Sequence, residues 1–194
     1  MRNLESFYKN MCALLDSIED TLAKQRILPC LTLVYSGIDV VASLEARDQE
    51  GVRSSFTRWV DDYLLKAGSF EFNALDLYAA RCAVVHTFTP ESDLSRSGKA
   101  RKISYAWGTA DVNRLGKASA ILNRSDMVHV HVNDLVKAFR SAIANYMDAV
   151  EADPSRQKAI EQAAGLWNVE MEPGPVEKLI EAHERALSYS PGTE

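Results

Sequence analysis

The sequence predicts an all-α protein, built as an antiparallel, up-and-down helical bundle with a small insert after its fourth helix. Apolar residues recur every three or four positions through most of the first ninety residues and again over 134–152. This is the period of an amphipathic helix. Residues that favour helix ends, such as Asn73 and Gly68, stand at the borders of these segments. Only residues 127–132 alternate strictly between polar and apolar side chains, as a strand does.

Composition and charge exclude several classes of protein. The 194 residues suffice for one hydrophobic core, and with 46% apolar and 25% charged residues the chain is not expected to be disordered. The formal net charge is −5, whereas a general nucleic-acid binder is usually basic. Any contact with RNA or DNA must therefore use a local basic patch.

The cysteines and the N-terminus bear on the compartment. Cys12, Cys30 and Cys82 are widely spaced and odd in number, so we expect buried thiols in a reducing environment and no disulfide framework. The N-terminus carries charges where a secretion signal is apolar, and no uncharged run approaches the roughly 20 residues of a membrane span. We therefore expect a cytoplasmic protein that does not contact a membrane.

Four helices are expected before residue 90, at about 4–26, 29–46, 51–67 and 73–89. In the fourth, Asn73 suits the N-cap, and Pro90 ends the helix because the residue before a proline avoids helical geometry. The residues expected to face the core from this helix are Leu75, Tyr78, Cys82 and Val85.

The insert is expected at about residues 89–132. It opens with a polar loop whose four basic and two acidic residues give it a charge of +2. Residues 103–108 and 127–132 are expected to form two short strands that pair as a small hairpin, with a short helix at about 112–122 between them.

The last strong helix is expected at 134–152, with Asn133 as its N-cap and a buried stripe of apolar residues. That stripe comprises Leu135, Phe139, Ala142, Ile143, Tyr146 and Val150. We expect residues 1–152 to form the bundle domain and residues 153–194 a C-terminal helical extension. A short helix is expected at about 155–166, and residues 171–175 can serve as a linker to a final helix. That final helix packs either on the core or on a partner chain.

The sharpest functional feature is the pair Arg81 and His86, which are separated by four residues. A five-residue step on a helix turns about 140° and rises about 7.5 Å. Both side chains therefore reach one cleft only if His86 lies at the helix end, or if two subunits share the cleft. Pro90 places His86 near that end. An imidazole moves protons at neutral pH, and a guanidinium binds a phosphate and stabilises developing charge.

Each residue of this pair also has a structural explanation. Arg81 can form a salt bridge to an acidic residue such as Asp39, and His86 can be a capping or core histidine. Asp39 stands near the apolar stripe of the second helix, where a carboxylate needs a partner. We expect Asp39 to face a polar cleft or to pair with an arginine, with a solvent-facing position as the alternative.

The segment LYAARCAVVH resembles the HEPN family (higher eukaryotes and prokaryotes nucleotide-binding domains), which is typed by an R-X4-6-H motif, with Arg81 and His86 on the motif positions. The resemblance implies a helical bundle, a homodimer with the motif near its two-fold axis, and often metal-independent endoribonuclease activity. It also implies toxin–antitoxin, abortive-infection or other defence settings, in which an antitoxin or regulatory protein is a partner. Many active members carry a polar residue directly after the arginine, where this chain has Cys82.

A basic cluster follows the motif, made of Arg96, Lys99, Arg101 and Lys102, and it precedes Tyr105 and Trp107. Cations neutralise phosphates and aromatic rings stack on bases, so this segment is a candidate RNA contact. The alternative is a solvated loop whose aromatic residues belong to the core.

His129 and His131 fall on the same side of the candidate strand. Two such histidines can chelate a metal, but an exposed strand face or a dimer contact fits better, and neither a metal site nor a cofactor is expected. The leading hypothesis is thus a HEPN-like, RNA-cleaving homodimer. The alternative is a non-catalytic helical module for dimerisation or partner binding. A basic cleft around the motif favours the first, and a motif neutralised by carboxylates favours the second.

Overall fold

The computed structural model describes residues 2–47, 49–164 and 173–188, and most of them are helical, as predicted. The helices are α1 (Arg2–Ala23), α2 (Ile27–Leu44), α3 (Val52–Trp59), the π-helix η1 (Val60–Leu64), α4 (Leu65–Ala67), α5 (Ala74–Thr87), α6 (Asp93–Arg96), α7 (Val112–Ile121), α8 (Val132–Ala152), α9 (Pro154–Ala164) and α10 (Pro173–Ser188). The strands are β1 (Lys102–Ala106) and β2 (Met127–His131). The chain divides into two compact units, residues 1–164 and residues 165–194.

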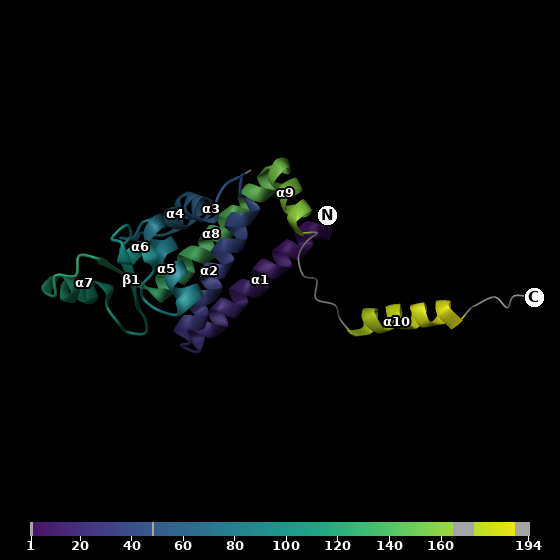
Figure 1. The fold of residues 1–194 in the computed structure, drawn as a ribbon, viewed down its shortest axis with the longest axis horizontal. Coiled ribbons are helices and arrows are strands. Elements are labelled where there is room, and N and C mark those ends of the chain that lie inside the picture. The colour runs from purple at the N-terminus through teal and green to yellow at the C-terminus, as the bar shows by residue number, and fades with distance from the viewer. Residues whose placement is uncertain (1, 48, 165–172, 189–194) are drawn as a thin grey trace, which may run out of the picture. The chain divides into compact units, whose positions relative to one another are not determined.

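The core of the first unit lies where α1, α2 and α8 run side by side (Figure 1). The predicted stripe of α8 is confirmed, since all six of its residues are buried. An aromatic cluster closes one part of this core. The ring of Tyr63 lies edge-on to that of Tyr146 at 5.4 Å and at the same distance from the ring of Trp59. Helix α5 packs on α2 and on α3.

The third predicted helix is divided by a π turn. The backbone N–H of Leu65 bonds to the carbonyl of Val60, five residues earlier, which is the π pattern. Trp59 and Leu64 are also five apart, and both are fully buried. The wider turn therefore brings both side chains to the core, which an unbroken α-helix does not do.

Helix α5 buries a different face from the predicted one. Leu75, Tyr78, Cys82 and Val85 are only half-buried. The buried apolar residues are instead Ala74, Leu77, Ala79, Ala80, Ala83 and Val84. The physical reason is that apolar residues occupy all sides of this helix, so the periodicity does not select one face. A half-buried apolar strip consequently runs along the helix that carries Arg81.

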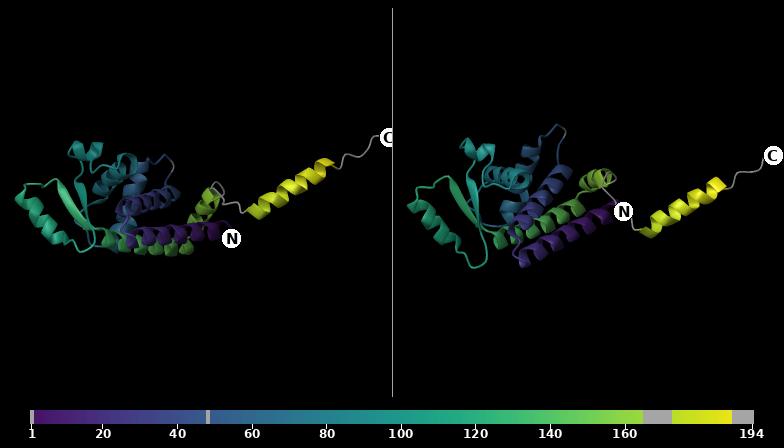
Figure 2. Two further views of the ribbon diagram at one scale, coloured as in Figure 1. Left: turned by 90° about the horizontal axis from the view of Figure 1, so that it is seen from below. Right: turned by 60° about the horizontal axis from the view of Figure 1, so that its bottom comes forward.

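The insert was wrongly expected to be a hairpin. Strands β1 and β2 pair in parallel, with Lys102 opposite Met127 and Ala106 opposite His131. Parallel strands need a crossover connection, and α7 supplies it. The strands contact α5 and α8 on the bundle side, while α7 packs on β2 and lies on the side away from the bundle (Figure 2).

The start of α8 also differs from the expectation. The N-cap is His131, whose Nδ1 accepts a hydrogen bond from the backbone N–H of Asn133 at 3.3 Å. Asn133 is therefore not the N-cap. The helix begins earlier than predicted because β2 runs directly into it, and the imidazole replaces the short polar side chain usually found there.

Helix α9 belongs with the first unit, and not with the extension expected to start at residue 153. It packs on α1, α2 and α8. Arg156 of this helix lies 2.9 Å from Glu45 Oε1 and donates to the hydroxyl of Tyr63 at 2.6 Å. These contacts tie α9 to α2 and to the π turn. The expected linker begins at residues 171 and 172, which lie outside the described residues.

Helix α2 is long and apolar enough to cross a membrane by length and composition. In the structure it packs on α1, α3, α5 and α8, and a buried helix of a folded core meets the same test. The three cysteines are free thiols, but only Cys30 is buried as expected, since Cys12 is exposed and Cys82 is half-buried. In the second unit, α10 exposes Leu179 and Ile180.

Candidate functional site

The structure brings Arg81 and His86 into direct contact. Nη1 of Arg81 lies 2.7 Å from Nε2 of His86, which belongs to the last turn of α5. A guanidinium only donates hydrogen bonds, so Nε2 of His86 must be unprotonated and accept. The condition set by the five-residue spacing is thus met within a single chain, because His86 stands at the helix end.

Asp39 of α2 holds the other edge of the same guanidinium. Its Oδ2 accepts from Nε of Arg81 at 2.8 Å and from Nη2 at 2.6 Å. The Arg81 side chain is 14% exposed and that of Asp39 23%. Burial lowers the pKa of Arg81, but the hydrogen bonds and negative charge of Asp39, together with a smaller effect of Cys82, raise it by more, so the pKa lies above its ordinary value. The arginine is therefore a fixed cation whose charge Asp39 balances.

A separate group of polar residues fixes the start of α5. Asn73 and Asp76 form a capping box, in which each side chain accepts from the backbone N–H of the other. Asp76 is buried, and it also receives three hydrogen bonds from Arg101, two from the guanidinium and one from the backbone. The insert is thus tied to the first turn of the helix whose last turn carries His86.

The role of Asp76 was not predicted from the sequence, although a signal for it exists. An asparagine followed three residues later by an acidic residue is the pattern of a capping box. Its second partner, Arg101, is 25 positions away and belongs to a different element, so no local pattern reveals it.

The opposite end of α5 turns sharply after His86. Phe88 takes the left-handed conformation with φ of 51°, and its backbone N–H bonds to the carbonyl of Ala83. This is a helix C-cap of the αL type, a position that glycine usually occupies. Pro90 follows two residues later, so the helix ends where the sequence predicts and leaves His86 exposed.

Most residues of the predicted basic cluster form ion pairs with carboxylates. Lys102 contacts Glu91 at 2.6 Å and Asp126 at 3.3 Å, Arg96 pairs with Asp93, and Arg101 pairs with Asp76 at 2.6 Å. Lys99 is exposed. These carboxylates balance much of the local positive charge, so an approaching phosphate meets a weaker field than the sequence indicates.

The two predicted aromatic contacts have different environments. The Tyr105 hydroxyl hydrogen-bonds to that of Tyr35 in α2, and burial raises the pKa of both groups. Tyr105 is half-buried, and its hydroxyl connects β1 to α2. Trp107 is 49% exposed, so its indole remains available for stacking.

The two histidines of β2 have separate roles. Both ring nitrogens of His131 are engaged, one in capping α8 and the other 3.2 Å from the carbonyl of Gly108. His129 is buried and pairs with Ser119 of α7 at 2.8 Å. Within residues 2–47, 49–164 and 173–188, no three histidine, cysteine or acidic side chains are grouped to hold a metal.

No protein-family model, no curated protein and no solved structure matches this chain.

Proposed function

We propose that the protein is a HEPN-like, metal-independent endoribonuclease that acts as a homodimer in an RNA-processing, toxin or defence setting. The observation that carries the proposal is the 2.7 Å contact between Nη1 of Arg81 and Nε2 of His86, at the exposed end of α5. An unprotonated imidazole beside a fixed guanidinium provides a base and a phosphate-binding cation at one point.

The proposed reaction uses the RNA 2′-hydroxyl as the nucleophile. When a phosphate oxygen binds to Arg81, the guanidinium releases Nε2 of His86, which then takes the proton of the 2′-hydroxyl. The 2′-oxygen forms a bond to phosphorus, and the bond from phosphorus to the 5′-oxygen breaks. The leaving oxygen takes a proton from the imidazolium or from water, which gives a 2′,3′-cyclic phosphate and a 5′-hydroxyl.

Asp39 is a positioning residue in this scheme. Its carboxylate engages Nε and Nη2 of Arg81, so Nη1 is the nitrogen directed at His86. The proposal includes a homodimer because the half-buried strip of Leu75, Tyr78, Cys82 and Val85 lies on the same helix as the motif. An antitoxin or regulatory protein is a further proposed partner.

The experiment compares RNA cleavage in EDTA by the wild-type protein, Arg81→Ala and His86→Ala, after light scattering has established the oligomeric state of each. Cleavage by the wild type that both substitutions abolish, with the oligomer unchanged, supports the proposal. Cleavage that survives both substitutions contradicts the assigned roles.

A second candidate function is a non-catalytic dimerisation or partner-binding module. One observation favours it, because Asp39 neutralises Arg81 and carboxylates pair with most cations of the insert. Under this alternative, Arg81 and Asp39 join α5 to α2, and His86 caps the helix end. An absence of cleavage across several single-stranded RNAs by a folded dimer favours this candidate.

A further inference from the structure

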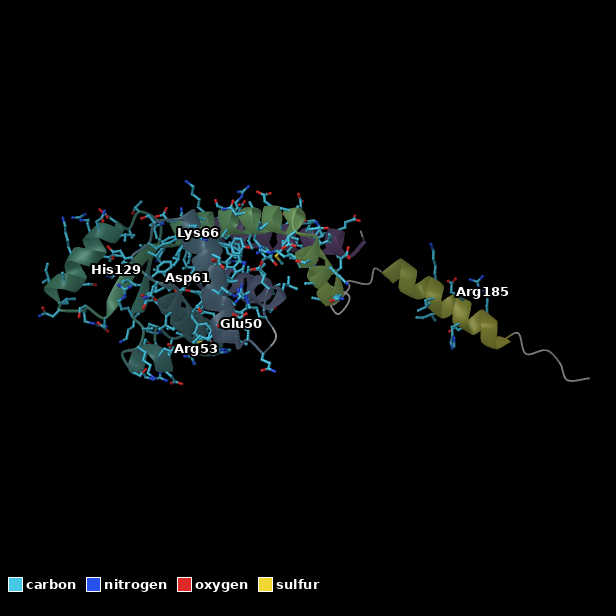
Figure 3. All side chains as sticks on the ribbon, turned by 90° about the horizontal axis from the view of Figure 1, so that it is seen from above. Glu50, Arg53, Asp61, Lys66, His129 and Arg185 are labelled. Atoms are coloured by element: carbon cyan, nitrogen blue, oxygen red, sulfur yellow. The ribbon has the colours of Figure 1, made fainter. Side chains whose placement is uncertain are left out.

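A cleft unrelated to the Arg81–His86 pair lies around His129, between α7 and the segment joining α4 to α5. One hollow of about 560 Å³ is lined by Asn113, Gly116, Ser119, Asn123 and Arg124, and a second of about 510 Å³ by Gly68, Phe70, Asp134 and Lys137. Glu71, Val112, Asn113 and His129 line both hollows. The His129 side chain thus lines two hollows that share one wall. Figure 3 labels His129 beside the ribbon of α7.

The orientation of the His129 ring follows from its neighbours. Nε2 lies 2.8 Å from the hydroxyl of Ser119, and Cδ2 lies 4.0 Å from where a Cβ on Gly116 would stand. These two adjacent ring atoms face α7, so the opposite edge, which includes Nδ1, faces away from it. Residue His129 is only 8% exposed, and Nδ1 has no hydrogen-bond partner among the described residues. Nδ1 itself is closed to solvent, so a molecule in the hollows does not reach this nitrogen and binds through the other groups that line them.

The side chains around this cleft carry no net formal charge, because Glu71 and Asp134 balance Arg124 and Lys137. The amides of Asn113 and Asn123 each offer donors and an acceptor, and Ser119 adds a hydroxyl. Such a lining suits a neutral molecule whose edge alternates donors and acceptors. The volumes fall in the usual range of small-molecule sites.

One wall includes the half-buried aromatic ring of Phe70. Phe70 stacks on Phe72, with ring centroids 4.6 Å apart and planes inclined by 19°. A Cβ on Gly68 would come within 2.5 Å of the Phe70 ring, so the glycine makes room for this ring at the edge of the cleft. Aromatic surfaces of this kind stack on heteroaromatic rings.

We propose that the cleft around His129 binds an uncharged nucleobase, supplied either by a free nucleoside or by an unpaired base of RNA. The base hydrogen-bonds to the Ser119 hydroxyl, and the asparagine amides read its edge. Occupation of this cleft does not require cleavage at Arg81 and His86.

Gly116 offers a direct test. It lies inside α7, where a glycine costs helix stability, and a Cβ added there would meet the His129 ring at 4.0 Å. Gly116→Leu places a side chain in the first hollow while favouring the helix, so the fold is expected to persist. Gly116→Ala is the matched control, because it changes the helix in the same direction but leaves most of the hollow open.

The experiment titrates the full chain with adenosine, guanosine, cytidine and uridine, and with a single-stranded oligonucleotide whose 2′-O-methyl groups prevent cleavage. An abasic oligonucleotide of equal length measures binding through the backbone alone. Calorimetry gives the affinity, and the His129 Cε1–H proton resonance, identified by its loss in His129→Asn, reports occupation.

A Kd of about 1 mM or tighter for at least one nucleoside supports the inference, if Gly116→Leu weakens it at least about 10-fold and Gly116→Ala does not. Binding of the base-containing oligonucleotide alone, with the same response to Gly116→Leu, identifies RNA as the source of the base. The inference is overturned if nothing binds, if the abasic strand binds equally well, or if Gly116→Leu binds like the wild type. Thermal unfolding of each variant establishes that it is folded.

Discussion

Nη1 of Arg81 donates to Nε2 of His86 at 2.7 Å, although the two residues are five positions apart on one helix. A five-residue step separates side chains by about 140° on a regular helix. The contact forms because His86 occupies the last turn of α5 and because Asp39 directs the guanidinium from the other side. The orientation of Arg81 therefore depends on α2 as well as on α5.

Removal of Asp39 tests this dependence. Asp39→Ala leaves a mostly buried guanidinium without its carboxylate, and we expect a loss of about 1–3 kcal/mol in the free energy of unfolding. If the site cuts RNA, loss of the correct geometry lowers the cleavage rate by as much as about 100-fold. Urea unfolding and cleavage assays measure the two effects. Asp93→Ala removes a fully exposed partner of Arg96 and serves as the control, with little change expected in either quantity. Equal effects of both substitutions would contradict the assigned role.

The hydroxyls of Tyr35 and Tyr105 are expected to behave as one unit. Tyr105→Phe leaves the buried hydroxyl of Tyr35 without a partner, which costs about 1–3 kcal/mol of unfolding free energy. Tyr35→Phe leaves the Tyr105 hydroxyl without its partner in the same way. The double substitution is expected to cost less unfolding free energy than the two single changes together. A double-mutant cycle in urea measures the coupling. Additive costs would show that the hydroxyls do not interact and would leave Tyr105 free for another role.

The ion pair between Glu50 and Arg58 predicts a specific acid dependence. Hydrogen bonds from Arg58 and from the backbone of Arg47 lower the pKa of Glu50 from 4.5 to about 2. Because the folded pKa lies below the unfolded value, this group stabilises the fold above about pH 4.5, and the contribution is lost as the pH falls toward 2. Unfolding free energies from pH 5 to pH 2 are expected to fall less steeply for Glu50→Gln. Arg58→Met, which removes the partner, should flatten the profile in the same way. An unchanged slope in both variants would refute the prediction.

The proposed homodimer is tested at the half-buried strip of α5. Val85→Arg places a charge in that strip, and we expect it to convert a dimer into a monomer without unfolding the chain. Light scattering measures the mass in solution. The matched control is Ile121→Arg, which changes an exposed apolar residue on α7 and should leave the dimer intact. A dimer that tolerates Val85→Arg would place the interface elsewhere.

The sequence predicts the helices well where one face is distinctly apolar. The six predicted core residues of α8 are all buried, because this helix has one distinctly apolar face. Helix α5 has apolar residues on every side, so the choice of its buried face depends on α2 and α3, which the local pattern does not contain. The parallel pairing of β1 and β2 was missed for a similar reason, because two short strands joined by a helix satisfy several pairings equally well.

The candidate site, like the fold, could be predicted only in part from the sequence. The spacing of Arg81 and His86 and the stop at Pro90 predict that the two side chains can meet, and they do. The partner of Arg81 was foreseen only as an alternative, since Asp39 is 42 positions away. The carboxylates that pair with Lys102 and Arg101 come from three different segments of the chain, so the neutralisation of the basic cluster was not predictable from the loop alone.

The most direct test of the central claim is cleavage, in EDTA, of one single-stranded RNA and of its all-2′-deoxy counterpart by the wild type and His86→Ala. We predict that the wild type cuts the RNA to fragments ending in a 2′,3′-cyclic phosphate, as mass spectrometry identifies, and leaves the deoxy strand intact. His86→Ala should cut neither. Equal cutting of both strands, or cutting of the RNA by His86→Ala, would contradict 2′-hydroxyl attack assisted by His86. A wild type that cuts neither strand would leave the non-catalytic module as the better description of this fold.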